Sequence, residues 1–155
     1  MNNYAIDATF LQLLDHLFPQ DLLEYFTITG IEETEHAKTG EKTVTISLDE
    51  KNSPPEIPEG HRDKRIVSKG FNHVQVVQDF PLRAHYCLLK IRTRRWEIEG
   101  AGKLERKLSF LPDSGLKLTT DFAVFLKEAD RTRTGRGRTH RETVRGKETG
   151  EGVQE

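Results

Sequence analysis

The sequence predicts an α+β protein, with helices near both ends of the chain and an antiparallel sheet of about five strands between them. Three observations support this class. Apolar residues near the N-terminus recur at the spacing of one helix face, stretches in the middle alternate apolar and polar residues, and 155 residues suffice for one ordinary domain. We therefore expect an α+β domain over residues 1–130 and a disordered basic tail over residues 131–155.

Two short helices are predicted at the N-terminus. The first is marked by a stripe of apolar side chains at helical spacing. The stripe consists of Ile6, Phe10, Leu13, Leu14 and Leu17. Pro19 interrupts this pattern and suits the first turn of a second helix over Gln20–Phe26, because proline lacks an N–H that the first turn would leave unpaired anyway.

A hairpin is predicted to follow. Phe26–Ile31 is rich in β-prone residues, and Thr43–Leu48 alternates so that Val44, Ile46 and Leu48 share the face that packs on the core. A Thr-Gly pair between the two stretches is typical of a turn. These features together predict two antiparallel strands.

Three further strands are predicted to form a meander. They cover Val74–Phe80, Tyr86–Ile98 and Leu104–Leu111, with a turn at Leu82–His85. Residues 49–65 contain three prolines and little apolar surface, so we expect a long loop there.

The last predicted element is a helix that Thr119 or Thr120 caps through its hydroxyl group. Its apolar face consists of Phe122, Phe125, Leu126 and Ala129. After Asp130 only Val144 and Val153 are apolar, so the tail has too little apolar surface to offset the entropy of ordering.

Charge is distributed unevenly along the chain. Residues 1–59 carry 3 Lys/Arg and 12 Asp/Glu, whereas residues 60–110 carry 12 and 5, and residues 131–147 carry 7 and 1. A basic middle and a basic tail favour a polyanionic partner. The alternative explanation is an ordinary solvated surface, in which the acidic front neutralises the basic parts within the fold.

The strongest local pattern is the stretch YCLLKIRTRRW over residues 86–96. In a regular strand, Cys87, Leu89 and Ile91 share the face toward the core, and Lys90, Arg92 and Arg94 share the other face at about 6.6–6.8 Å spacing, which is comparable to the spacing of phosphates along DNA. Trp96 would end this row and could stack on a base, while Arg106 and Lys107 could extend it from a neighbouring strand. The alternative is a solvated sheet face whose cations pair with Glu97, Glu99 or the acidic front.

Several classes of function lack their motifs. No dinucleotide, Walker A, nucleophile-elbow, HExxH or CxxC motif occurs, and no run of about 18 apolar residues could span a membrane. The single cysteine, Cys87, excludes an internal disulfide and favours a reducing cytoplasm. A zinc site would need His61 and His73 besides His85 and Cys87, so we expect no metal and treat Cys87 as a small core residue.

The sequence resembles the N-terminal region of bacterial insertion-sequence transposases of the ISAon type, related to the ISL group. The similar stretches are residues 13–33, 44–52, 68–96 and 118–128. The most specific part is the string KGF…VQDFP.R…L.I..RRW. It is carried by Lys69, Gly70, Phe71, Val77, Gln78, Asp79, Phe80, Pro81, Arg83, Leu89, Ile91, Arg94, Arg95 and Trp96.

This resemblance implies a region that precedes a helix–turn–helix and a catalytic Asp-Asp-Glu domain and that takes part in binding the element's terminal repeats. Many ISL members carry a zinc-finger-like set of cysteines around the corresponding strand, whereas no cysteine follows Trp96 here. The catalytic domain is also missing, as expected for a separately encoded first frame of a split element, with the tail as a possible out-of-frame extension.

The prediction for function is therefore a non-catalytic, cytoplasmic accessory region of a transposase, without cofactors, that binds DNA at the element's ends. The predicted DNA-contacting residues are Arg83, Lys90, Arg92, Arg94, Trp96, Arg106 and Lys107. A protein-interaction module that assembles with the separately encoded catalytic domain through the acidic front is the alternative, and a remnant without activity is a third. Self-association is left open.

Overall fold

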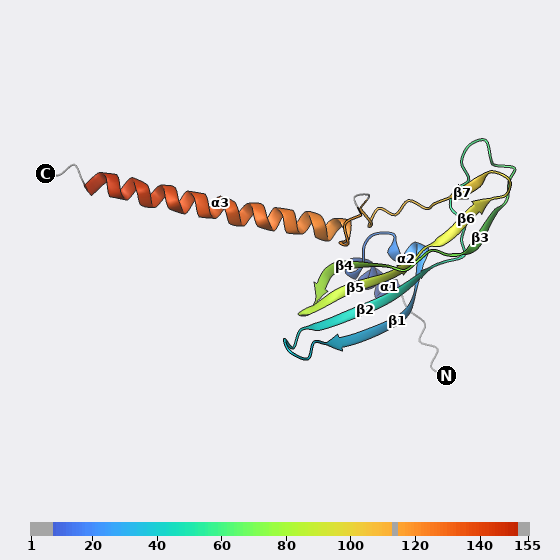
Figure 1. Ribbon diagram of the computed structural model, residues 1–155, viewed down its shortest axis with the longest axis horizontal. Helices are drawn as coiled ribbons and strands as arrows, with labels where there is room; N and C mark the ends of the chain where they lie inside the picture. Colours follow the sequence, from blue (N-terminus) through green and yellow to red (C-terminus); the bar gives the residue numbers. More distant parts are fainter. Residues whose placement is uncertain (1–7, 113–114, 152–155) are drawn as a thin grey trace. The chain divides into compact units, whose positions relative to one another are not determined.

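The computed structural model describes residues 8–112 and 115–151, and beyond residue 135 it describes the backbone alone. The chain forms two units with a boundary between Thr120 and Asp121, ten residues before the predicted end of the α+β domain. The first unit contains two short helices and seven strands in two sheets, and the second contains one long helix (Figure 1). The α+β class is confirmed.

The two N-terminal helices are α1 (Ala8–Leu17) and α2 (Leu22–Tyr25), close to the predicted ranges. Leu22 on α2 is fully buried, whereas α1 buries none of its residues. Phe10, Leu13 and Leu17 of the predicted apolar stripe are about half exposed, whereas Phe18, directly after this helix, packs against the core. Ile6 of the stripe lies outside the described residues.

The larger sheet has four strands in the order β1 (Phe26–Glu35), β2 (Lys42–Glu50), β5 (His85–Arg92) and β4 (Gln75–Leu82). The predicted β1–β2 hairpin is confirmed, and β4 pairs with β5 in a second hairpin. The two hairpins join through β2 and β5, which run parallel. The prediction of a purely antiparallel sheet is therefore wrong at its central pair.

The smaller sheet has three antiparallel strands in the order β3 (Ile66–Phe71), β6 (Arg94–Ile98) and β7 (Gly102–Leu104). The predicted single strand over Tyr86–Ile98 is divided at Thr93, so that β5 and β6 belong to different sheets. The sequence does not predict β3, a short strand whose residues are half-buried or exposed and whose register is irregular between Ser68 and Phe71.

The predicted strand over Leu104–Leu111 ends already at Leu104. The rest of that segment is irregular, yet Phe110 is buried and its ring meets Phe26 edge-on at 5.9 Å between centroids. Leu108 and Phe110 nonetheless pack on the core, which they cover from a turn and not from a strand.

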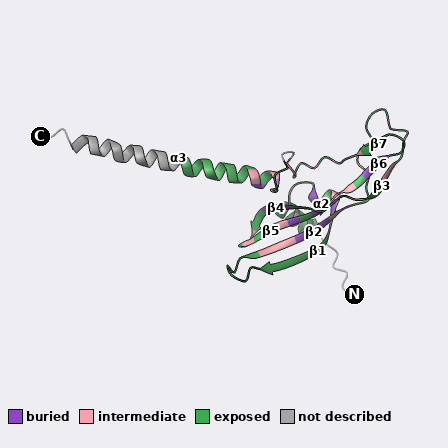
Figure 2. Cartoon of the chain, in the orientation of Figure 1, coloured by how far each residue is buried: buried purple, intermediate pink, exposed green. Residues whose placement is uncertain are grey.

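The core lies on one face of the four-stranded sheet, where α2 and the segment around Phe110 cover it (Figure 2). The predicted core-facing residues Ile46 and Leu48 of β2 are buried. Cys87, Leu89 and Ile91 of β5 are buried beside them, as expected. Alternation in β2 and β5 thus predicts correctly which face packs.

The second unit, from Asp121 onward, contains α3 (Thr120–Glu151), which begins at the predicted position. The hydroxyls of Thr119 and Thr120 donate to a carboxylate oxygen of Asp79 and to the carbonyl oxygen of Ser109, at 2.8 and 3.0 Å. The helix continues far beyond Ala129, into residues 131–151, for which the sequence predicts disorder. Arginine, lysine and glutamate have good helix propensity, and the hydroxyls of Thr132 and Thr134 donate to the carbonyls of Glu128 and Asp130 at 3.0 and 2.6 Å. Residues 152–155 of the predicted tail lie outside the described residues.

No helix among the described residues is long and apolar enough to cross a membrane.

Candidate nucleic-acid interface

The break at Thr93 changes which residues of the basic stretch share a face. Odd-numbered residues are buried in β5, whereas the even-numbered Trp96 and Ile98 are buried in β6. Trp96 is only 2 % exposed. The predicted row of Lys90, Arg92, Arg94 and Trp96 along one wet face is therefore wrong, because the alternation shifts by one residue where the chain passes between sheets.

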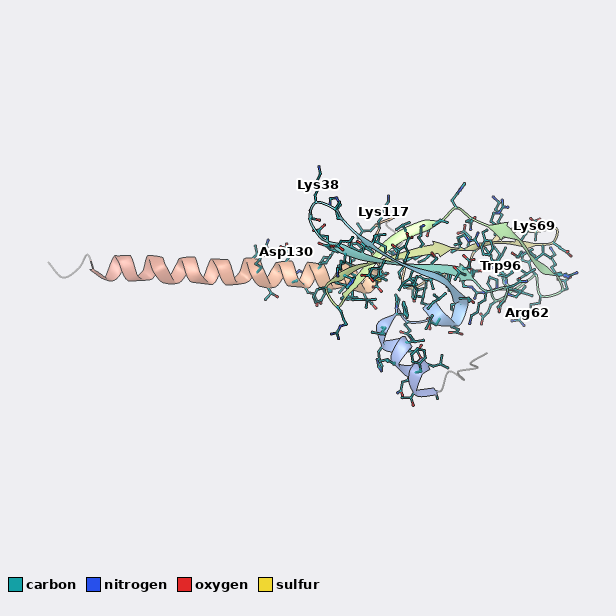
Figure 3. All side chains as sticks on the ribbon, turned by 90° about the horizontal axis from the view of Figure 1, so that it is seen from below. Lys38, Arg62, Lys69, Trp96, Lys117 and Asp130 are labelled. Atoms are coloured by element: carbon teal, nitrogen blue, oxygen red, sulfur yellow. The ribbon has the colours of Figure 1, made fainter. Side chains whose placement is uncertain are left out.

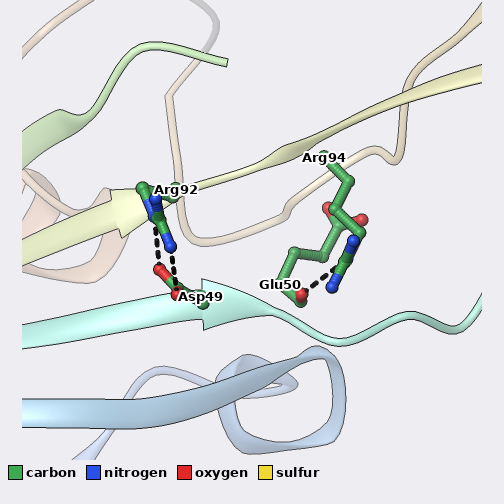
Figure 4. Close-up of polar contacts among 4 residues, drawn as sticks. All are labelled: Asp49, Glu50, Arg92 and Arg94. Atoms are coloured by element: carbon green, nitrogen blue, oxygen red, sulfur yellow. Dashed lines mark hydrogen bonds and ion pairs between the residues drawn. The ribbon is translucent and has the colours of Figure 1, made fainter. Parts of the chain in front are cut away.

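Arg92 is held by an acidic neighbour on β2. Its Nε and Nη2 donate to the two carboxylate oxygens of Asp49 at 2.7 and 2.5 Å, a bidentate pair between directly opposed residues (Figure 4). This hydrogen bonding lowers the pKa of Asp49 and raises that of Arg92. Arg92 thus follows the alternative reading of a paired cation on a solvated face.

Arg94 is anchored between the sheets. Its Nε donates to the carbonyl oxygen of Glu50 at 2.9 Å, and its Nη1 donates to the hydroxyl of Ser68 at 3.1 Å. The ring of Phe71 lies 4.6 Å from this guanidinium and 4.2 Å from that of Arg92. These contacts fix the orientation of Arg94 before any ligand arrives.

Glu50 lies buried at the junction of the two sheets. Its side chain continues the core-facing alternation of Ile46 and Leu48, and its residue exposure is 2 %. The indole N–H of Trp96 donates to its carboxylate. Burial raises the pKa of Glu50, although the hydrogen bond from Trp96 and the charge of Arg106 act in the opposite direction.

Arg106 approaches the same region from the irregular segment after β7. Its Nη2 donates to the carbonyl oxygen of Ser53, and its guanidinium lies 4.2 Å from the centre of the Tyr25 ring. Its Nε is buried and has no hydrogen-bond partner among the described residues. Arg106 is therefore a half-buried cation held by its stem and by one edge of its guanidinium.

Glu50, Arg94 and Arg106 line a groove of about 1260 Å³, which we call the basic groove. Three of the predicted DNA-contacting residues meet there. They are Arg94, Arg106 and Lys107. Asn72, His73 and Thr93 form part of its wall, and the two acidic residues along it are Glu50 and Glu105. Lys107 is exposed, so its charge is accessible to a ligand.

Four of the predicted residues lie elsewhere. Lys90 is exposed on the face of β5 opposite the core, Arg92 pairs with Asp49, and Trp96 is buried. Arg83 belongs to the tight turn between β4 and β5, where it has a φ of 47°. Figure 3 labels Trp96 and Lys69 in the region of the smaller sheet, and Lys38 at the turn between β1 and β2.

Sequence reasoning missed Glu50, Asn72 and His73 as groove residues. The signal for Glu50 was present, because it follows Ile46 and Leu48 at the same two-residue period. No pattern in the sequence indicates that Asn72 and His73 line the groove. The backbone N–H of Asn72 donates to the carbonyl oxygen of Thr93 at 2.8 Å and its side-chain amide donates to the Thr93 hydroxyl at 2.9 Å, a pairing that depends on the break in the strand.

A second hollow of about 630 Å³ lies at the β4–β5 turn and includes Arg83 and His85. The Nδ1 of His85 lies 2.9 Å from the carbonyl oxygen of Arg83, and its Nε2 lies 3.1 Å from a carboxylate oxygen of Glu33. Because both ring nitrogens face acceptors, the contact with Arg83 and then that with Glu33 raise the pKa of His85.

Cys87 lies two residues after His85 on the same strand and is buried as a core residue. Burial, and next the charge of Asp79, raise the pKa of its thiol to about 11. Within residues 8–112 and 115–151, no group of three or more histidine, cysteine, aspartate and glutamate side chains is arranged to hold a metal ion.

Comparison with protein-family models, with curated proteins and with solved structures finds no match for this chain.

Proposed function

We propose that this chain is a non-catalytic accessory region of a bacterial transposase that acts in the cytoplasm by binding the ends of its mobile element. The resemblance over residues 13–128 supports the role in transposition. The observation that carries DNA binding is the basic groove, because it gathers Arg94, Arg106 and Lys107 from two separate segments beside an open hollow.

The groove suits a phosphate backbone better than a small anion. Its volume of about 1260 Å³ exceeds what a single phosphate needs, and its cations come from β6 and from the segment after β7. Arg94 is held in place by Glu50 and Ser68, so binding would cost little ordering of this side chain. Lys107 would add an exposed, mobile charge at the rim.

A lysine substitution tests the proposal. In Lys107→Ala, we expect the affinity for a duplex carrying the element's terminal repeat to fall severalfold, because one phosphate contact is lost. The slope of log affinity against log salt should become shallower by about 0.9. Gel-shift titrations over a series of salt concentrations measure both quantities.

Two other exposed lysines give matched controls, since each removes one charge outside the groove. Lys103 lies on β7 and Lys90 on the outer face of β5. We expect both alanine variants to keep the wild-type salt slope. If Lys90→Ala lowered the affinity for DNA and Lys107→Ala did not, the DNA-binding surface would be the outer face of the sheet, and the role of the groove would be contradicted.

Assembly with a separately encoded catalytic domain is the second candidate function. It is favoured by α1, where Phe10, Leu13 and Leu17 share one helix face and are 48 %, 55 % and 48 % exposed. An apolar helix face of this kind is typical of protein interfaces. Binding of the catalytic domain through α1 should depend weakly on salt, in contrast to DNA binding.

A further inference from the structure

The strand β1 forms the open edge of the four-stranded sheet. Its only strand partner among the described residues is β2, and it lies at the margin of the sheet in Figure 1. The opposite edge, β4, is covered, because Gln78 exchanges backbone hydrogen bonds of 2.9 Å with Lys117 and Thr119. One edge of this sheet is therefore paired with another segment of the chain, whereas the other edge is open.

The exposed part of β1 is regular enough to accept another strand. An irregularity lies between Ile28 and Gly30, and the register then runs unbroken from Gly30 to Glu35. Each residue of this segment is exposed (Figure 2). It contains no proline, and every charge along it is negative, so the edge opposes pairing with another acidic strand and not with a basic one.

The side chains along this segment define what would pair with it. Ile31 continues the buried row of Ile46 and Leu89, yet it is 70 % exposed because no strand follows it. Glu33 and Glu35 lie on the same face as Ile31, and Glu32 lies on the other face. An added strand would therefore meet one apolar position and three carboxylates.

A second copy of this strand is a poor partner. Self-pairing would bring two sets of three glutamates onto one pair of strands, and like charges on adjacent strands are destabilising. A strand with lysine or arginine at these positions would instead form cross-strand ion pairs.

We propose that β1 binds an extended, basic segment of another protein by strand addition at Gly30–Glu35. Main-chain hydrogen bonds supply affinity, the glutamates select cationic side chains, and Ile31 becomes buried against an apolar residue of the partner. This surface is separate from the basic groove, so either proposal can fail without the other.

The test uses the full-length chain labelled with ¹⁵N and a capped peptide, Thr-Lys-Val-Lys-Lys-Val-Lys-Thr, which reads the same in both directions. We expect saturable shifts of the β1 amides in NMR titrations. The same peptide methylated on the backbone nitrogens of its four lysines keeps its charge but loses main-chain donors, and we expect it to bind at least tenfold more weakly.

A charge-reversal pair tests the role of the glutamates. Glu32→Lys with Glu35→Lys should weaken binding at least tenfold, whereas Glu33 is left intact because it contacts His85. The matched control is Glu56→Lys with Glu59→Lys, which reverses two exposed charges in the loop and should leave affinity within twofold.

Three results would overturn the proposal. One is peptide binding that the methylation leaves unchanged, which would mean attraction by charge alone. Another is an absence of shifts in β1 when the wild-type chain is titrated. The third is a concentration-dependent dimer of the free chain whose β1 amides become protected from exchange, which would assign the edge to a second copy.

Discussion

At the scale of single residues, Glu50 has the most unusual environment among those described. It is a buried carboxyl group whose pKa is raised mainly by burial, and it accepts a hydrogen bond from Trp96 of the other sheet. Because the pKa is higher in the folded than in the unfolded state, the folded chain binds more protons. The contribution of Glu50 to stability is therefore full below its usual pKa of 4.5 and is lost as the pH rises through the folded-state value.

This pH dependence of stability predicts how the variant Glu50→Gln should behave. The amide keeps an oxygen that accepts from Trp96 but has no charge to desolvate, so at about pH 4 its free energy of unfolding should lie within about 1 kcal/mol of the wild type. As the pH rises to about 8, the free energy of unfolding of the variant should increase relative to that of the wild type. Urea denaturation at both pH values measures it. A difference that does not change with pH would mean that Glu50 titrates as an exposed carboxylate.

Residue-level reasoning from the sequence worked where one face was uniformly apolar. It identified Ile46, Leu48, Leu89 and Ile91 correctly, because strict alternation leaves one assignment of the core face. It failed for Trp96, since a shift of one residue at Thr93 exchanges the faces and nothing in the local pattern marks that shift.

At the scale of elements, the long helix α3 differs most from expectation. Its described side chains from Arg131 to Gly135 are all exposed. Because these side chains bury little surface, this part of the helix depends on the helix propensities of its residues. Composition-based reasoning predicts disorder for such a segment because it considers the formation of a core and not of an isolated helix.

A truncation after Asp130 distinguishes helix from disorder. If residues 131–151 are helical, circular dichroism at 222 nm should lose the signal of those residues, whereas loss of a disordered tail would leave helical content unchanged. The melting temperature should change by about 2 °C or less, because the side chains described in this segment, those of residues 131–135, are exposed and exposed residues contribute little to stability. A drop of many degrees would show that this segment packs against the rest of the chain.

At the scale of the whole molecule, the sequence predicts hairpins well and their assembly poorly. Each hairpin depends on neighbouring residues and a local turn. The parallel pairing of β2 with β5 and the division into two sheets depend on contacts between distant segments, such as Val44 with Cys87. The basic groove has the same origin, since Arg94 and Arg106 meet only after the two sheets have formed. For this reason the cations could be named from the sequence but their partners could not.

The parallel pair at the centre of the four-stranded sheet also has a consequence for the order in which we expect the chain to fold. Each β2–β5 contact closes a separation of 43 residues, whereas each hairpin closes a short loop. We expect the hairpins to form early and their docking to limit the rate. In stopped-flow refolding, Leu89→Ala at this junction should then give a φ-value above about 0.5, and Phe110→Leu, in the segment that covers the core afterwards, one below about 0.3. The reverse ranking would mean that the cover forms before the sheet is complete.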